Sequence, residues 1–261
     1  MGDRGRRVGR VLAVLALGAA IGLALAPAAG AQIKVRTIAA GLSYENFSRT
    51  VFWGGDAEAS KIVANLVTAR ADLGLGKGVV VGLNAGLALT GNEGLVFDAL
   101  PISLELGAKT LRGFSLGADV VAPVDKFSDF EISGTGRLVY SFGMAKTWTL
   151  QDFAVEGRAR GESSWIEAAA GPRVSYLFFR RVVPYVEVWA RWLHASFTMT
   201  ETLADLSGRE TRRVRGDVSF SVALGADATV SDRIAVRAKA GILPYAGGVD
   251  GLVAVGVLYK F

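Results

Sequence analysis

The sequence lacks cysteine altogether and has one histidine among its 261 residues. Without cysteine there is no disulfide framework, no lipid-acylated cysteine and no thiolate metal site. A single histidine cannot form the cluster that binds zinc, and the acidic residues are scattered rather than gathered in an Asp-rich calcium loop. We therefore expect neither a metal nor another cofactor.

Long apolar runs are also missing beyond the first 31 residues. No uninterrupted stretch of 18 apolar residues occurs there, so a membrane-spanning helix is not expected. The mean hydropathy of +0.36 is nevertheless high. Strands with one apolar and one polar face, closed into a barrel, reconcile a high hydropathy with recurring charges.

The N-terminus has the pattern of a cleaved signal peptide over residues 1–31. Arg4, Arg6, Arg7 and Arg10 form a positive region, an apolar stretch follows, and Ala29-Gly30-Ala31 is a small-residue cleavage site. The apolar stretch is shorter than the ~20 residues of a transmembrane anchor, the alternative interpretation. Residues 32–261 contain no Pro- or Ser-rich linker, so we expect them to form one domain.

The basic character of the chain comes largely from this leader. Its removal takes away four arginines and one aspartate and lowers the formal net charge from +5 to +2. Nucleic-acid binding requires a concentrated basic face, and we therefore expect no nucleic-acid partner.

Period-two alternation predicts an all-β fold. Arg233, Ala235, Arg237 and Lys239 alternate with apolar neighbours, and residues 213–230 continue the same pattern. We predict a single antiparallel transmembrane β-barrel of about 12 strands, with ten as the alternative count. The expected strands are 33–47, 62–75, 79–90, 100–108, 113–123, 129–142, 148–158, 163–178, 184–199, 213–230, 233–244 and 250–261.

The last six residues support a membrane location. Phe261 is a terminal aromatic, Tyr259 is hydrophobic at the third position from the end, and Gly256 is sixth from the end. These positions resemble the assembly signal of bacterial outer-membrane β-barrel proteins, although Ala254 replaces a polar residue favoured by that family. The resemblance implies export to the bacterial outer membrane, with lipid, lipopolysaccharide and the barrel-assembly machinery as partners. It leaves the oligomeric state open.

Loop lengths and aromatic residues predict an orientation with both termini in the periplasm. The expected short periplasmic turns are 76–78, 109–112, 143–147, 179–183 and 231–232, and the longest outer loops are 48–61 and 200–212. The expected periplasmic aromatics are Tyr140, Phe142, Trp148, Tyr176, Phe178, Tyr259 and Phe261. The expected outer aromatics are Phe130, Trp165, Trp192, Phe197 and Tyr245.

Charged residues on the polar face of the strands are candidates for a lumen lining. They are Arg70, Asp72, Glu105, Asp119, Glu131, Arg137, Glu167, Arg173, Glu187, Arg191, Asp217, Asp227, Arg237 and Lys239. Such a lining either surrounds an aqueous path for small polar solutes or forms ion pairs that fill the interior. The sequence does not distinguish these two arrangements.

One pair of residues suggests catalysis. His194 and Ser196 lie two apart on an expected strand, so their side chains share a face and can act as base and nucleophile. The pair resembles the His-x-Ser element of outer-membrane phospholipase A and of the lipid A deacylase. Those families continue with Asn, whereas Phe197 follows here. Glu162 and Glu210 are distant candidates for an orienting acid, and the alternative is a polar pair in the interfacial girdle.

The sequence thus favours a porin-like passage for small polar solutes or a structural membrane role, without enzymatic activity. The alternatives are a lipid-modifying hydrolase that uses His194 and Ser196, and a soluble periplasmic binding barrel. A soluble barrel would expose a far larger apolar surface than monomers usually show.

Overall fold

The computed structural model describes residues 35–53, 58–106, 110–150, 156–179, 181–245 and 247–261. The signal peptide expected over residues 1–31 lies outside these residues. The strands are β1 (Thr37–Trp53), β2 (Glu58–Gly74), β3 (Val80–Glu93), β4 (Val96–Phe97), β5 (Leu104–Glu105), β6 (Leu111–Phe127), β7 (Phe130–Gly143), β8 (Lys146–Leu150), β9 (Gly157–Tyr176), β10 (Val182–Leu203), β11 (Leu206–Thr229), β12 (Ile234–Tyr245) and β13 (Gly248–Lys260).

A 3-10 turn, η2 (Gly76–Gly78), joins β2 to β3. Within the described ranges, no helix is both long and apolar enough to cross a membrane.

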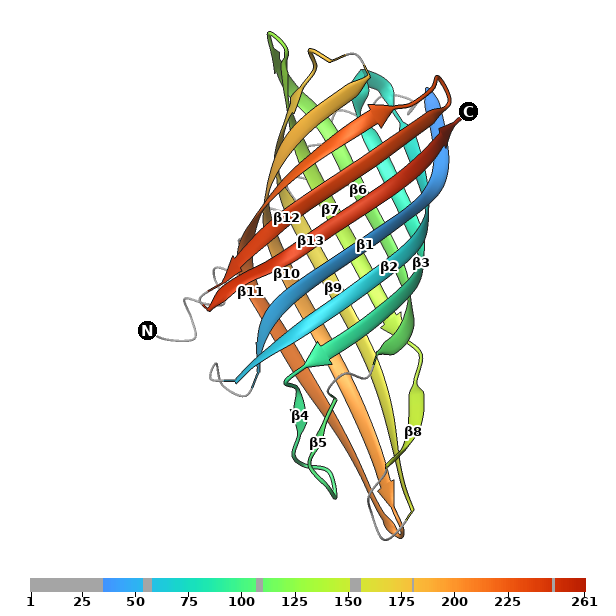
Figure 1. Ribbon diagram of the computed structural model, residues 1–261, viewed down its shortest axis with the longest axis vertical. Coiled ribbons are helices and arrows are strands. Elements are labelled where there is room, and N and C mark those ends of the chain that lie inside the picture. The colour runs from blue at the N-terminus through green and yellow to red at the C-terminus, as the bar shows by residue number, and fades with distance from the viewer. Residues whose placement is uncertain (1–34, 54–57, 107–109, 151–155, 180, 246) are drawn as a thin grey trace, which may run out of the picture.

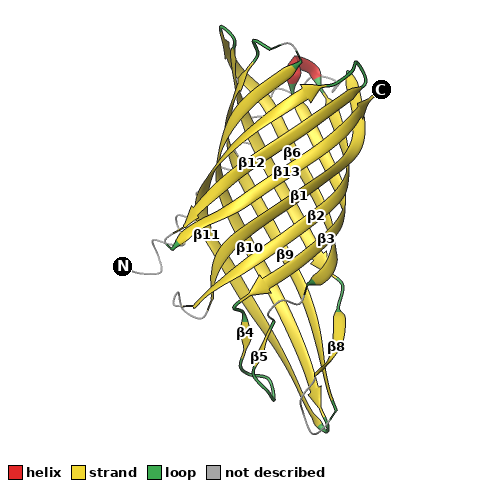
Figure 2. Ribbon diagram, viewed as in Figure 1, coloured by secondary structure: helices red, strands yellow, loops and turns green. Residues whose placement is uncertain are grey.

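Ten of the described strands close into an antiparallel barrel (Figures 1 and 2). Their order around the wall is β1, β2, β3, β6, β7, β9, β10, β11, β12 and β13, and β13 pairs with β1 to complete the ring. The strands β4 and β5 form a separate two-stranded sheet, and β8 pairs with the end of β9. The predicted antiparallel barrel is confirmed, and its wall has the alternative count of ten.

Two of the twelve expected wall strands do not form wall strands of their own. Among the described residues, the segment 100–108 contains β5 alone, and 148–158 contains the end of β8 and the start of β9. In the first segment Leu100, Leu104 and Leu106 do alternate with other residues, but Leu100 and Leu106 are buried in the hydrophobic core. Alternation identifies a buried face without showing whether lipid or protein covers it.

The wall strands have one apolar outward face and one inward face of mixed character. On β10, Val186 and Val188 are exposed on the outside, whereas Glu187 and Trp189 are buried inside. The outward residues are apolar from Val182 to Trp192, close to the ~9–11 residues that a tilted strand needs to cross a membrane. The barrel therefore presents an apolar band to its surroundings.

A β-bulge changes the expected alternation on β11. Arg191 pairs with Ser219 and Leu193 pairs with Gly216, so two residues of β11 lie opposite Trp192. Because of this extra residue, the inward and outward faces of β11 are exchanged between the two sides of the bulge. Arg213 and Arg215 are consequently exposed, whereas Val214 is buried, the reverse of a regular alternation from residue 213 to residue 230.

The two ends of the barrel differ. At the end where β1 starts and β13 ends, successive strands are joined by the short segments 75–79, 128–129, 177–181 and 230–233. At the other end lie β4, β5, β8 and the extensions of β9, β10 and β11 (Figure 1). Because outer-membrane barrels have short periplasmic turns and longer extracellular loops, we call the end with the short turns the periplasmic end and the opposite end the extracellular end.

Some of the expected joins are wrong. Two segments expected as periplasmic turns, 109–112 and 143–147, lie at the extracellular end in their described residues, 110–112 and 143–147. The reason is that β6 and β7 are joined at the periplasmic end by a tight turn at Ser128, which has a φ of 51°. The segments 48–61 and 200–212 consist largely of strand, since β1 and β2, like β10 and β11, continue well beyond the apolar band.

The predicted position along the barrel is correct for some of the expected periplasmic aromatic residues and for some of the expected outer ones. Tyr176, Phe178, Tyr259 and Phe261 lie at the periplasmic end, but so does Phe130, whose ring centroid is 5.0 Å from that of Tyr176. Tyr140 and Phe142 lie at the extracellular end, beside Phe114. Trp148 lies on β8, beside the core.

The remaining expected outer aromatics divide between two faces. Trp165 and Phe197 are buried inside the barrel. Trp192 lies on the outward-facing parity of β10 toward the extracellular end. Tyr245, the last residue of β12, lies on the inward parity of that strand, which it shares with the buried Leu243.

Candidate functional site

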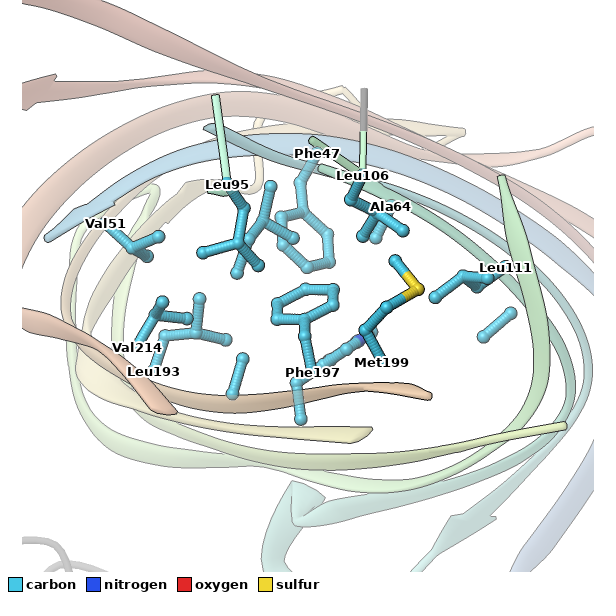
Figure 3. Close-up of a cluster of buried hydrophobic side chains, with 14 of the residues drawn as sticks. Phe47, Val51, Ala64, Leu95, Leu106, Leu111, Leu193, Phe197, Met199 and Val214 are labelled. Carbon is cyan, nitrogen blue, oxygen red and sulfur yellow. The ribbon is translucent and has the colours of Figure 1, made fainter. Parts of the chain in front are cut away.

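An apolar layer fills the extracellular half of the barrel interior. Phe47 packs edge-on against Trp165 at 5.3 Å, and both belong to a cluster that includes Phe197 and Met199 (Figure 3). All four side chains are at most 1% exposed. The interior at this level is therefore closely packed by side chains.

The connection between β3 and β6 supplies part of this layer. Leu95, Phe97, Leu100 and Leu106 all belong to the buried cluster. The backbone N–H of Ile102 donates to Glu201 at 3.1 Å, and that of Ala99 donates to Glu210 at 2.8 Å. These bonds tie the connection to the extension of the wall formed by β10 and β11.

A polar cavity of about 380 Å³ occupies the periplasmic half of the interior. Its lining includes Gly78 and Leu177, which belong to the periplasmic turns, and Leu66, which belongs to the apolar cluster. The cavity therefore extends from the periplasmic turns to the apolar layer. Tyr185 and Trp189 contribute aromatic surface to its wall.

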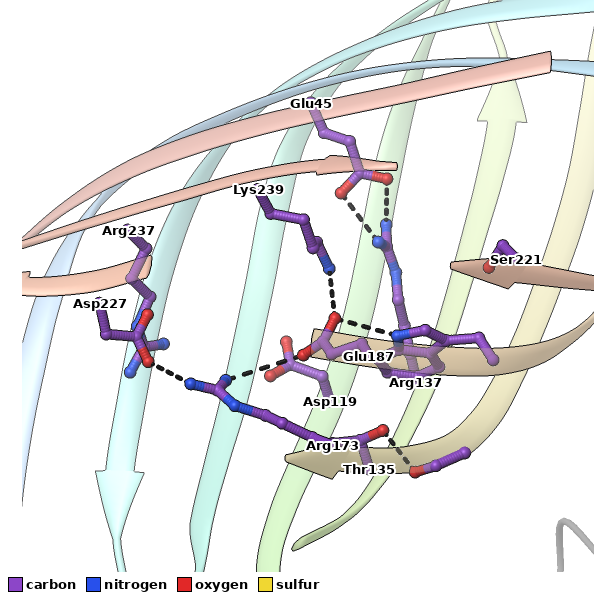
Figure 4. Close-up of polar contacts among 12 residues, drawn as sticks. Glu45, Asp119, Thr135, Arg137, Arg173, Glu187, Ser221, Asp227, Arg237 and Lys239 are labelled. Atoms are coloured by element: carbon purple, nitrogen blue, oxygen red, sulfur yellow. Dashed lines mark hydrogen bonds and ion pairs between the residues drawn. The ribbon is translucent and has the colours of Figure 1, made fainter. Parts of the chain in front are cut away.

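Ion pairs connect the charged residues of the cavity into a chain, and Figure 4 shows the part of it around Arg173 and Glu187. Arg70 on β2 binds Asp119 on β6 through two bonds of 2.7 Å and Asp72 through its Nε at 2.8 Å. Asp72 also accepts a bond of 2.6 Å from Arg237, whose Nε lies 3.4 Å from Asp227. The chain thus crosses from one side of the barrel to the other.

The second half of the chain is centred on Arg173. This guanidinium donates to Asp227 at 2.6 Å and lies 3.7 Å from Glu187. Its carbon also stands 3.5 Å from the ring centroid of Tyr185, a favourable cation–π geometry. Glu187 accepts bonds from Trp189 at 2.9 Å and from Lys239 at 3.5 Å.

Two more pairs lie next to the apolar layer. Arg137 binds both oxygens of Glu45 at 2.8 Å, and Arg191 binds Glu167 at 2.5 Å while donating to Ser221 at 2.9 Å. Arg191 and Glu167 are each 1% exposed. Buried charges at such sites need these partners, because removing one partner costs about 3–5 kcal/mol.

The interior is close to electrically neutral. The chain of ion pairs contains four carboxylates and four cations, and each of the two deeper pairs adds one of each. A lining of this kind offers little net attraction to ions of either sign. Its charges are engaged with one another.

The structure places most of the expected lumen residues at this site. The cavity is lined by Arg70, Asp119, Glu131, Arg137, Arg173, Glu187, Asp227, Arg237 and Lys239. Asp72 is buried in the same ion-pair chain, and Glu167 and Arg191 form the deeper pair.

Two expected lumen residues belong neither to the cavity lining nor to its ion pairs. Glu105 lies on β5, outside the ten-stranded wall, and accepts a bond from the N–H of Gly94. It does not line the lumen. The side chain of Asp217 lies outside the described residues, at the bulge of β11.

Sequence reasoning missed Glu45, Tyr185 and Trp189. Glu45 stands between Tyr44 and Asn46 in a segment whose alternation is weak, but it follows the parity of the buried Phe47. Tyr185 and Trp189 alternate in step with Glu187 and Arg191 along β10. This shared parity could have identified both aromatic residues as interior ones. Aromatic residues were expected on the membrane side alone.

His194 and Ser196 share the outward face of β10, just beyond Trp192, whose ring stacks on that of His194 at 6.3 Å. Across the neighbouring strands, His194 lies opposite Ile166 and Arg215, and Ser196 lies opposite Ser164 and Arg213. Neither has a carboxylate as a direct neighbour across these strands.

The two acids considered as orienting groups are placed elsewhere. Glu162 lies opposite Thr198, a further row away from His194. Glu210 binds the backbone of Ala99 and pairs along β11 with the buried Met199. A catalytic serine requires an oriented imidazole, and this arrangement provides no described acid to orient it.

Two residues of the assembly signal, Gly256 and Tyr259, lie on β13, the strand that closes the barrel, and Phe261 directly follows this strand. Tyr259 pairs with Ala40 and Gly256 with Ser43 on β1, and the N–H of Phe261 donates to the carbonyl of Ile38 at 2.9 Å. Tyr259 and Phe261 point outward, with ring centroids 5.2 Å apart.

Groups of three or more potential ligands for a metal ion do not occur in the described part of the chain. No family model matches the sequence. No curated protein matches it either.

The comparison with solved structures identifies the fold. The outer-membrane protease OmpT from Escherichia coli superposes with a TM-score of 0.52 at 10% identity, covering 89% of this chain and 99% of that one. The translocator domain of the autotransporter NalP from Neisseria meningitidis gives 0.44 at 11% identity, covering 99% and 98%. An outer-membrane channel from Pseudomonas putida gives 0.41 at 7% identity, covering 88% and 97%. The superposition on OmpT indicates a shared fold, and an identity of 10% does not extend the likeness to activity.

Proposed function

We propose that this chain is a bacterial outer-membrane β-barrel protein that serves a structural role, with a lumen closed to diffusing solutes. The observation that carries the proposal is the apolar layer around Phe47, Trp165 and Phe197, which lies across the interior above the polar cavity. A water-filled path would have to cross this layer. The cavity then communicates with the periplasm alone.

The ion-pair chain supports the same proposal. Its carboxylates and cations bind one another across the barrel, which links strands that are not neighbours in the wall, such as β2 with β12 and β9 with β11. In a permeation path, charged side chains contribute to passage when they are free to contact the solutes. Charges engaged in mutual pairs stiffen the barrel instead.

Porin-like passage of small polar solutes is the second candidate. The cavity of about 380 Å³, with charges of both signs, is the observation that favours it. For passage to occur, the apolar layer and the β3–β6 connection would have to move aside. The two candidates differ in whether the resting barrel conducts ions.

Single-channel recording on the refolded protein in molar KCl tests the proposal. We expect no stable conductance steps from the wild type. A variant with Phe47→Ala, Trp165→Ala and Phe197→Ala should conduct, because it empties the centre of the apolar layer. The matched control replaces outward aromatics instead, with Phe114→Ala, Tyr140→Ala and Phe142→Ala, and should remain silent. Regular steps from the wild type would favour porin-like passage.

The proposed role does not include catalysis. A hydrolase acting on lipid through His194 and Ser196 would need an orienting group that the neighbouring strands do not supply among the described residues. A soluble periplasmic barrel is disfavoured by outward side chains such as Leu42, Phe220 and Leu224, each more than 60% exposed. Such a surface is suited to lipid.

A further inference from the structure

Five arginines on the extracellular outer wall differ from those of the interior. They are Arg158 and Arg160 on β9 and Arg209, Arg213 and Arg215 on β11, and all five are exposed. The interior arginines of the cavity are held by carboxylates at 2.5–2.8 Å. Across the described residues, none of the five outer arginines takes part in an ion pair.

Strand register places four of these arginines on one continuous surface. Arg215 lies beside His194, Arg213 lies beside Ser196, and Thr200 lies between Arg160 and Arg209. We call the four residues Arg160, Arg209, Arg213 and Arg215 the outer arginine cluster. The hydroxyl residues of β10 between them add further hydrogen-bond donors for an anion.

A groove lies within this surface. It has a volume of about 230 Å³ and is lined by Arg160, Glu162, Thr198, Thr200 and Arg209. Two guanidinium groups on either side of threonine hydroxyls suit an oxyanion such as phosphate, which arginine binds through paired N–H donors. Glu162 is the acidic member of the lining.

The cluster begins where the lipid-facing band ends. The outward residues of β10 are apolar up to Trp192, and the next outward positions, His194 and Ser196, lie level with Arg215 and Arg213. Outward residues recur every ~7 Å along a strand, or ~5 Å in height in a tilted barrel. Arg215 and Arg213 therefore lie within ~10 Å of the hydrocarbon boundary, at the depth of lipid headgroups.

The height of the cluster indicates which headgroup it fits. Arg160 and Arg209 lie two further rows of outward residues beyond Arg213, or ~10 Å higher by the same geometry. A glycerophospholipid carries its phosphate in one thin layer and would contact only the lower arginines. A lipid whose saccharide headgroup carries phosphates at several heights can contact all four.

From this placement we propose that the outer arginine cluster is a binding site for the phosphate groups of an anionic lipid with a phosphorylated saccharide headgroup, in the outer leaflet. The lower arginines bind phosphate at the hydrocarbon boundary, and the groove between Arg160 and Arg209 binds phosphate further out. The site is separate from the lumen, so it stands whether or not the barrel conducts.

The test measures the affinity of the refolded barrel in neutral detergent for fluorescent lipopolysaccharide with a phosphorylated inner core. The comparison ligands are the same lipopolysaccharide after chemical dephosphorylation, and phosphatidylglycerol. We expect the wild type to bind the phosphorylated form at least about tenfold more tightly than either comparison ligand. Added salt should weaken this binding.

Variants locate the site. Replacing the four cluster arginines by glutamine should lower the affinity for the phosphorylated form by at least about tenfold. The matched control removes four exposed cations at the periplasmic end, with Arg36→Gln, Lys77→Gln, Lys126→Gln and Arg181→Gln. It should bind as the wild type does, and heat-modified gel migration verifies that each variant has folded.

Several outcomes would overturn the proposal. Equal wild-type affinity for the phosphorylated and dephosphorylated forms would show that acyl chains alone are bound. Equally tight binding of phosphatidylglycerol would indicate an ordinary anionic surface. Equal losses in the cluster and control variants would indicate an effect of net charge. Full competition by inorganic phosphate at low millimolar concentration would indicate a site for a free anion. If the cluster variant does not fold, the affinities of the wild type for the phosphorylated form, the dephosphorylated form and phosphatidylglycerol still test the proposal.

Discussion

At the scale of single residues, the face on which a side chain lies determines what its replacement costs. Ala238 points outward near the middle of β12, and its neighbour Arg237 points inward to Asp72 and Asp227. Both acids keep a second partner without Arg237, because Asp72 also binds Arg70 and Asp227 also binds Arg173. Replacing Arg237 therefore leaves neither Asp72 nor Asp227 without an arginine partner.

This difference gives a prediction for adjacent positions. Ala238→Arg should lower the free energy of unfolding by ~2–4 kcal/mol, since it places a charge in hydrocarbon near the midplane. Arg237→Val should cost less. Urea titrations of both variants in lipid vesicles, read by tryptophan fluorescence, measure the two values. The reverse order would mean that the inward and outward faces of β12 have been exchanged.

The pair His194 and Ser196 gives a second prediction at this scale. Purified protein in mixed micelles with calcium should release no more fatty acid from phospholipid or lipopolysaccharide than a Ser196→Ala variant, because no acid orients the imidazole. Thr198→Ala, on the same face, is the matched control. Release that disappears in both Ser196→Ala and His194→Ala, but persists in Thr198→Ala, would make this protein a hydrolase.

At the scale of elements, β13 completes the wall. It pairs with β12 on one side and with β1 on the other, so the ring cannot close before this last strand is in place. Its terminal aromatics, Tyr259 and Phe261, are exposed at the periplasmic end. They are therefore available to an assembly factor that receives the strand from the periplasm.

Deletion of Phe261 tests this role. We expect a lower yield of folded barrel in the outer membrane, with little change in the stability of the fraction that folds, because the Phe261 side chain is 80% exposed and packs mainly against Tyr259. Heat-modified migration of membrane fractions measures the yield. Phe178→Ala, which removes another exposed periplasmic aromatic, is the control. A yield equal to that of the wild type would remove the assembly role.

At the scale of the whole molecule, the interior changes character along the barrel axis. The periplasmic half holds the charged cavity and the extracellular half holds the apolar layer. The two halves should therefore differ in access to water-soluble reagents. The absence of cysteine from the chain allows each position to be probed by a single introduced thiol.

Labelling with a membrane-impermeant maleimide tests this polarity. Asn84→Cys, in the cavity wall, should react when the periplasmic side is opened and should be protected in intact cells. Asp205→Cys, in the turn between β10 and β11, should react in intact cells. Phe197→Cys, in the apolar layer, should react in neither preparation. Labelling of Asn84→Cys from outside in intact cells would indicate an open lumen.

The sequence by itself determined the fold class, the outward parity and most of the charged residues of the interior. Period-two alternation is a local property of the chain, and a closed barrel converts it directly into two faces. For this reason residues such as Arg70, Arg173 and Lys239 were recognisable as interior groups, and Ile234 and Val236 as lipid-facing ones.

Tertiary structure decided the strand count, the bulge and the apolar layer inside the barrel. Leu100 and Leu106 show the same alternation as a wall strand, yet they are buried against Phe47 and Phe197 in the core. The pattern records that water is excluded from a face, and it does not record whether lipid or protein excludes it. The outward turn of Arg213 and Arg215 likewise depends on one extra residue opposite Trp192, which only the pairing of β10 with β11 fixes.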